Sequence, residues 1–235
     1  MSDNLKKKTV NALKWSAVDR FGQQVVQFFI GILLARLLTP DDYGLIGMIM
    51  IFAALAFVLV ESGFGQALIR KQNATELDYS SVFYFNIFTS ILLYILLFFS
   101  TPYIAAYFNQ PQLDLLGKVV FTALLFNALY LVHFAKMMKE MDFKSIAKVN
   151  LISTAISGLI GVIMAFSKFG VWSLVAQQVT FHFFRMIAYQ LVVKWRPKLL
   201  FSFSVIREFW GFTLPILGTA LLNVVFNNLY VFILG

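Results

Sequence analysis

The sequence predicts an all-α integral membrane protein, built as a polytopic bundle of helices. Of its 235 residues, 60% are apolar and only 13% are charged, whereas soluble domains average roughly 45–50% and 25%. The mean hydropathy is +0.80, so the chain has too little polar surface to cover a soluble globule, and lipid must surround much of it. Long stretches without a charged residue recur along the chain.

Seven stretches are predicted to cross the membrane, because about 20 mostly apolar residues span the hydrocarbon core. Thr101 and Pro102, with the polar residues 109–111, are expected to break an uncharged run that is too long for one span. The predicted spans are residues 15–38, 43–67, 79–100, 113–135, 149–167, 171–193 and 209–235.

The basic residues indicate the orientation of these spans. If the N-terminus is cytoplasmic, most of the 19 lysines and arginines fall on the inner side. Only Arg36, Lys118 and Lys168 fall on the outer side, and Arg20 and Arg185 fall within spans. This is the usual positive-inside pattern, so the basic charge predicts a cytoplasmic N-terminus and requires no nucleic-acid partner.

No metal site and no cofactor are predicted. The chain has no cysteine, which excludes disulfides, thiolate metal sites and cysteine nucleophiles. The adjacent Asp41 and Asp42 follow Thr39 and Pro40. That order is typical of a capped helix start, with the acidic residues at the positive end of the helix dipole.

Polar residues inside spans are the candidates for function, because they are costly in lipid and tend to face a wet interior. On the first and sixth spans they fall on one helical face. The substrate-binding candidates are Arg20, Gln23, Gln24 and Gln27 on the first span, and Gln178, His182, Arg185 and Tyr189 on the sixth.

Depth along the helices favours a shared basic vestibule near the cytoplasmic side. At about 1.5 Å per residue, Arg20, Arg185 and Glu61 lie at similar depths, and Asp19 or Glu61 is expected to pair with Arg20. Such a vestibule suits a diphosphate, because arginine supplies both charge and a donor fork. The alternative is that the amides and His182 form ordinary helix contacts while the arginines extend to the interface.

Five sequence strings together resemble a known family. They are GILLARLLTPDDYGLIGM, ESGFGQALIRK, GVWSLVAQQ, KWRPKLLFS and FTLPILGTALLNVVFNNLYVFILG. They are similar to the polysaccharide transporter family, the lipopolysaccharide or oligosaccharide flippases of the multidrug/oligosaccharidyl-lipid/polysaccharide exporter superfamily. The resemblance implies two lobes of six or more helices, and movement of polyprenyl-diphosphate-linked sugars to the outer leaflet of the bacterial inner membrane. It also implies membrane lipids, a polysaccharide polymerase and glycosyltransferases as partners.

The same resemblance divides the chain. Residues 1–14 are expected to form a cytoplasmic segment, residues 15–200 a six-helix N-lobe, and residues 201–235 a connector and the first helix of a C-lobe. A shift of about 200 residues places Gln23 over Asn223 and Gln27 over Asn227, as a parallel repeat would. The chain is therefore expected to be half of a longer transporter. Tyr230 departs from the family, which usually has Asp there.

Two other functions remain open at this point. A cation-coupled multidrug exporter of the same superfamily should carry carboxylates in its cavity in place of arginines. A non-transporting membrane component of polysaccharide assembly would need no polar stripes at matching depth. An enzyme is not predicted, because the short loops carry no pair of acid and base residues.

Overall fold

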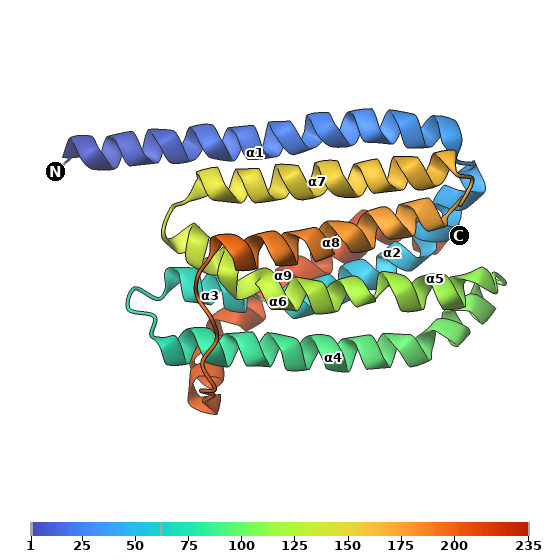
Figure 1. Ribbon diagram of the computed structural model, residues 1–235. Helices are drawn as coiled ribbons and strands as arrows, with labels where there is room; N and C mark the ends of the chain where they lie inside the picture. Colours follow the sequence, from blue (N-terminus) through green and yellow to red (C-terminus); the bar gives the residue numbers. More distant parts are fainter. Residues whose placement is uncertain (1, 62, 235) are drawn as a thin grey trace.

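The computed structural model describes residues 2–61 and 63–234, with side chains described for residues 10–61, 63–224 and 226. Within these ranges the chain forms nine helices and no strand, and the long helices lie side by side along one direction (Figure 1). The helices are α1 (Ser2–Leu37), α2 (Pro40–Glu61), α3 (Phe64–Arg70), α4 (Glu76–Tyr107), α5 (Gln112–Val120), α6 (Thr122–Lys139), α7 (Phe143–Phe166), α8 (Trp172–Val192) and α9 (Phe203–Leu234).

Each of the seven predicted spans is helical over most of its described residues. The protein is therefore an all-α polytopic membrane protein. In the described part of the chain, five stretches are long and apolar enough to cross a membrane. They are Pro40–Arg70, Glu76–Tyr107, Gln112–Lys139, Phe143–Phe166 and Phe203–Val224. The remaining long helices, α1 and α8, are less apolar because they carry the two polar stripes.

The start of α2 forms as predicted. Thr39 precedes the helix, and its backbone N–H donates to Asp42 Oδ2 at 2.9 Å, while the Asp42 N–H donates to Thr39 Oγ1 at 3.3 Å. This reciprocal pair satisfies donors that the first helical turn leaves free. The aspartates of this turn therefore have a structural role at a helix end.

Pro102 does not end its helix, which corrects the sequence expectation. Proline lacks the N–H that would bond to the carbonyl of Phe98, four residues earlier. The Thr101 Oγ1 lies 2.9 Å from that carbonyl and 2.6 Å from Asp114 Oδ1, so its one proton is shared between these two acceptors. The helix α4 continues past Pro102 to Tyr107. The chain turns afterwards, at Asn109, whose φ is 54°.

Two further helix breaks lie within predicted spans. Gly63, at the start of α3, has φ 78°, a left-handed conformation that glycine adopts at little cost. This break separates α2 from α3 within one predicted span. A second break at Phe121 separates α5 from α6.

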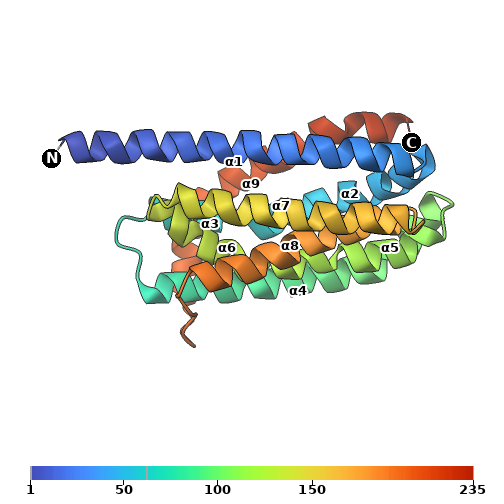
Figure 2. The same cartoon turned by 45° about the horizontal axis from the view of Figure 1, so that its top comes forward.

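The packing order differs from the order in the chain. In Figures 1 and 2, α1 lies along α7, and α8 lies beyond α7. The α1–α7 contact is close because Gly158 leaves room for the Ile30 side chain, which a Cβ at that position would meet. Since α1 packs along α7 and not along α2 in the described structure, the predicted neighbourhood of Arg20 and Glu61 does not form.

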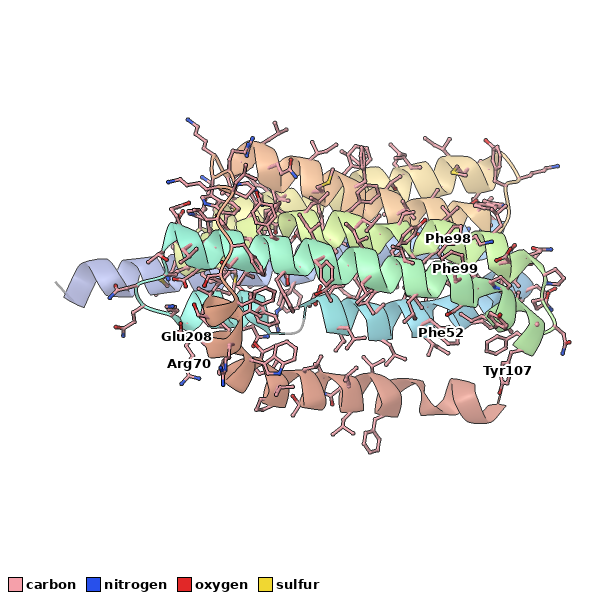
Figure 3. The ribbon with its side chains drawn as sticks, turned by 90° about the horizontal axis from the view of Figure 1, so that it is seen from below. Phe52, Arg70, Phe98, Phe99, Tyr107 and Glu208 are labelled. Atoms are coloured by element: carbon pink, nitrogen blue, oxygen red, sulfur yellow. The ribbon has the colours of Figure 1, made fainter. Side chains whose placement is uncertain are left out.

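Helix α9 begins against α3 and α4 at one end of the bundle and then runs along the side formed by α2. Figure 3 shows α9 beside α2, away from α7 and α8. Its first turns bury Val205, Ile206 and Phe209 against Phe64 and Leu68 of α3. The preceding connector is fastened to α4, since the Ser202 N–H donates to Ser81 Oγ at 3.0 Å. Two residues used above for the internal repeat and the family resemblance have side chains outside the described part of the structure: Asn227 and Tyr230. Gly235 lies wholly outside it.

Candidate functional site

Arg185 of α8 points into the bundle and lies among aromatic rings. Its carbon Cζ is 4.7 Å from the centre of the Tyr130 ring, 5.1 Å from that of Phe181 and 5.8 Å from that of Tyr189. Such contacts between a cation and ring faces are attractive. The Arg185 Nε is buried without a hydrogen-bond partner among the described residues, and no carboxylate there lies within ion-pair distance of this guanidinium.

A cavity of about 140 Å³ opens beside this guanidinium, between α2, α3, α6 and α8. Glu61, Gln66, Tyr130 and Arg185 contribute its polar lining. The Glu61 Oε1 accepts a hydrogen bond from Asn127 Nδ2 at 3.0 Å, so the carboxylate is held by α6. The cavity therefore has one carboxylate and one guanidinium on its walls.

His182, one turn before Arg185, is buried against α2 and α6. Its ring stacks on Phe57 with centroids 4.7 Å apart, and its Nδ1 lies 3.5 Å from the Tyr130 hydroxyl. That hydroxyl accepts a hydrogen bond from Asn127 Nδ2 at 3.2 Å, so Asn127, Tyr130 and His182 form one polar group inside the bundle. Gln178, one turn before His182 on α8, is partly buried.

A second polar chain links α1, α7 and α8. Asp19 accepts hydrogen bonds from Gln23 Nε2 at 2.7 Å and from Asn150 Nδ2 at 3.2 and 3.1 Å. The Tyr189 hydroxyl donates to Asn150 Oδ1 at 3.2 Å. Tyr189 is completely buried and also stacks on Tyr130, so this chain reaches the aromatic rings around Arg185.

Arg20 does not lie in this site, which corrects the predicted ion pair. Among the described residues it pairs neither with Asp19, which binds Gln23 and Asn150, nor with Glu61, which faces Arg185 across the cavity. Arg20, Gln24 and Gln27 are exposed on α1. The reason is the packing of α1 on α7: of the polar residues on this stretch of α1, Asp19 and Gln23 are partly buried toward the bundle, whereas Arg20, Gln24 and Gln27 are not.

Three residues of this site escaped the sequence analysis: Asn127, Tyr130 and Asn150. Each lies in an apolar predicted span and is buried. Their signal was present, because a polar side chain within a membrane span needs a partner. Charged residues and amide-rich stripes form stronger patterns in the sequence than single amides do, so those patterns did not lead to these three residues.

The fold and the site define a polytopic helical membrane protein whose interior presents an arginine and a carboxylate to a small cavity. Residues 33–235 match the family model described as "Polysaccharide biosynthesis protein". The chain belongs to this polysaccharide biosynthesis family, the class to which the sequence resemblance pointed.

Curated relatives carry matching names. The chain is 26% identical over 234 residues to the teichuronic acid biosynthesis protein TuaB of Bacillus subtilis (strain 168), covering 99% of this chain and 48% of TuaB. It is 23% identical over 224 residues to the succinoglycan biosynthesis transport protein ExoT of Rhizobium meliloti (strain 1021), covering 95% of this chain and 45% of ExoT. It is also 25% identical over 150 residues to the lipopolysaccharide biosynthesis protein WzxC of Escherichia coli (strain K12), covering 63% of this chain and 30% of WzxC.

The chain spans about half the length of TuaB and ExoT. No solved structure matches it.

Proposed function

We propose that the protein containing this chain is a flippase, which moves a polyprenyl-diphosphate-linked oligosaccharide from the cytoplasmic to the outer leaflet by alternating access of two lobes. Family membership and the name of its relative ExoT, a succinoglycan biosynthesis transport protein, support transport. The proposed location is the bacterial inner membrane with the N-terminus in the cytoplasm, in agreement with the bias of basic residues.

One observation carries the choice of cargo: the Arg185 guanidinium lines a cavity, its Nε is buried without a hydrogen-bond partner, and no carboxylate in the described structure lies within ion-pair distance of it. Because a partly buried cation without a carboxylate partner is incompletely neutralised, an anion that enters the cavity would complete the site. A diphosphate fits because its oxygens accept paired hydrogen bonds from the planar guanidinium. In our proposal, Glu61 balances this charge across the cavity while cargo is absent.

The remaining candidates have supporting roles in the proposal. Gln178, His182 and Tyr189 lie on the same stripe of α8 as Arg185. In the proposal, the partly buried Gln178 assists in binding the head group, while the buried His182 and Tyr189 support the aromatic rings around Arg185. On α1, Arg20, Gln24 and Gln27 form an exposed polar face that contacts the sugar or the second phosphate, and Gln23 orients this helix through Asp19. The proposed partners are the lipid-linked oligosaccharide and surrounding lipids, together with the polymerase and glycosyltransferases of the same assembly.

Transport in proteoliposomes tests the proposal. The full-length protein should move a fluorescent polyprenyl-diphosphate sugar between leaflets. Arg185→Ala should abolish that movement, and Arg185→Lys should keep part of it, because the charge remains while the fork is lost. Arg36→Ala, at the exposed end of α1, is the matched control. Transport by Arg185→Ala at the wild-type rate would overturn the proposal.

The same assay separates the alternatives. A cation-coupled multidrug exporter should move cationic dyes, with activity that depends on Glu61 and not on Arg185. A non-transporting assembly component should move neither kind of substrate. Either outcome with a correctly inserted protein would replace the flippase by that alternative.

A further inference from the structure

Asn150 lies at the centre of three helices and uses both ends of its amide. It is 5% exposed. Its Nδ2 donates to both carboxylate oxygens of Asp19 on α1, and its Oδ1 accepts from the Tyr189 hydroxyl on α8. A flip of the amide would turn its oxygen toward the carboxylate and its N–H group toward a hydroxyl that donates. The two partners therefore fix one orientation of this side chain.

Tyr189 transmits that orientation to the aromatic rings around Arg185. Its ring stacks on Tyr130 with centroids 5.4 Å apart and meets the edge of Phe134 at 5.9 Å. The hydrogen bond from the Tyr189 hydroxyl to Asn150 fixes the position of the Tyr189 ring relative to the Tyr130 ring. The Arg185 Cζ lies over both stacked rings, so the position of Tyr189 determines where the guanidinium rests.

Among the described residues of α1, only Asp19 is hydrogen-bonded to the Asn150–Tyr189 pair. The α1–α7 contact brings Asp19 to Asn150, and no other residue of α1 bonds to the Asn150–Tyr189 pair. A displacement of α1 from α7 would remove the carboxylate that holds the amide. Asn150 could then turn, and Tyr189 would lose its fixed acceptor.

We infer that Asn150 is a positioning residue that couples the placement of α1 to anion binding at Arg185. With α1 seated on α7, Asn150 holds Tyr189, and the guanidinium is presented to the cavity in one geometry. When α1 moves away, the same guanidinium is less ordered and binds the anion more weakly. The inference rests on the proposed function, because it assigns a role toward the anion that Arg185 would bind.

Binding of inorganic pyrophosphate to the purified full-length protein tests the inference, with thermal unfolding recorded for every variant. Tyr189→Phe removes only the hydroxyl, and Asn150→Leu removes the amide at similar volume. Each should weaken pyrophosphate binding about fivefold, the size expected for the loss of one organising hydrogen bond. Asp19→Leu should weaken binding similarly, and Asp19→Asn should weaken it less, because an amide oxygen still accepts from Asn150.

The control is Ser157→Ala, a buried α7 residue two turns from Asn150 that bonds only within its own helix. If Tyr189→Phe and Asn150→Leu bind pyrophosphate as tightly as Ser157→Ala does, while Arg185→Ala binds it weakly, the inference is wrong and the proposed function stands. If Arg185→Ala binds like the wild type, the proposed function itself fails. A loss of affinity with unfolding temperatures equal to the control supports the positioning role, because packing alone would lower stability without selectively lowering affinity.

Discussion

Tyr130 of α6 and Tyr189 of α8 stack with their planes 20° from parallel, and the Arg185 guanidinium lies over both rings. Each hydroxyl is hydrogen-bonded to an asparagine, Asn127 for Tyr130 and Asn150 for Tyr189. The two asparagines in turn bind carboxylates, Glu61 and Asp19. Arg185 therefore contacts two tyrosine rings, and each tyrosine is linked through an asparagine to a carboxylate. No acidic residue described here forms an ion pair with Arg185 itself.

The first prediction concerns Glu61. Glu61→Gln keeps an oxygen that can accept from Asn127 and removes the negative charge that faces Arg185 across the cavity. We expect pyrophosphate to bind several-fold more tightly, because repulsion between the two anions is gone. Glu140→Gln, an exposed change of the same kind, should leave the affinity unchanged. Weaker binding to Glu61→Gln would show instead that the carboxylate is needed to orient Arg185.

The second prediction concerns the junction of α3, α4 and α9, where Figure 3 shows Glu208 and Arg70 side by side. The Lys71 Nζ lies 3.0 Å from both Asp78 Oδ1 and Glu208 Oε2. The Asp78 side chain is 4% exposed and that of Glu208 57%. Lys71→Met should therefore destabilise the fold by about 1–3 kcal/mol, since it leaves a buried carboxylate without its cation. Glu208→Gln should cost about 0–1 kcal/mol.

The same junction should respond to alkaline pH. Burial opposes the charge on Lys71, but its hydrogen bonds to Asp78 and Glu208 outweigh burial and raise the pKa of Lys71 above its ordinary value of 10.5. A raised pKa means that this stabilisation is complete below pH 10.5 and is lost as the pH rises through the folded-state pKa. Unfolding temperatures measured across that range should fall more for the wild type than for Lys71→Met. Parallel curves would contradict the ion-pair account.

A third prediction follows from the α1–α7 contact. Gly158→Val would push its side chain into Ile30, and we expect a loss of about 1–3 kcal/mol from overpacking. Gly47→Val, at a helical glycine with open space around its Cβ position, should cost clearly less. Ile30→Ala combined with Gly158→Val should recover part of the loss. Equal unfolding temperatures for the two valine variants would mean that α1 does not pack here as described.

The fourth prediction addresses orientation across the membrane. The chain contains no cysteine, so a single Gln110→Cys substitution gives one labelling site in the turn after α4. A membrane-impermeant maleimide should label it from outside the cell, because the bias of basic residues predicts that this turn lies opposite the cytoplasm. Ser145→Cys, at the start of α7, should be labelled only after the membrane is opened. The reverse pattern would invert the proposed topology.

The sequence predicted where the helices lie in the chain better than which helices pack against each other. Local periodicity placed His182, Arg185 and Tyr189 on one face of α8, because a helix fixes that relation within a few residues. It could not show that α1 packs on α7, since that choice depends on small residues such as Gly158, far away in the chain. The pairing of Arg20 with Glu61 failed for this reason, although the matching depths were a sound argument for residues on adjacent helices.

Pro102 shows a similar limit on a smaller scale. Proline usually ends a helix, and only the structure shows that the hydroxyl of Thr101 lies near both the Phe98 carbonyl that Pro102 leaves free and the carboxylate of Asp114. The amide network had a weak local signal, because Asn127 and Asn150 stand alone in apolar spans. Their partners, Glu61 and Asp19, come from other helices, so the network became visible only when the helices were packed.

The central claim is that Arg185 binds the anionic head group of the cargo, and equilibrium titration with inorganic pyrophosphate measures it most directly. Calorimetry on the full-length protein in detergent should show saturable binding that weakens about 10- to 100-fold in Arg185→Ala, the loss expected for charge-assisted hydrogen bonds worth roughly 1.5–3 kcal/mol. Arg36→Ala should bind like the wild type. Unchanged affinity in Arg185→Ala, with the protein folded, would contradict the account.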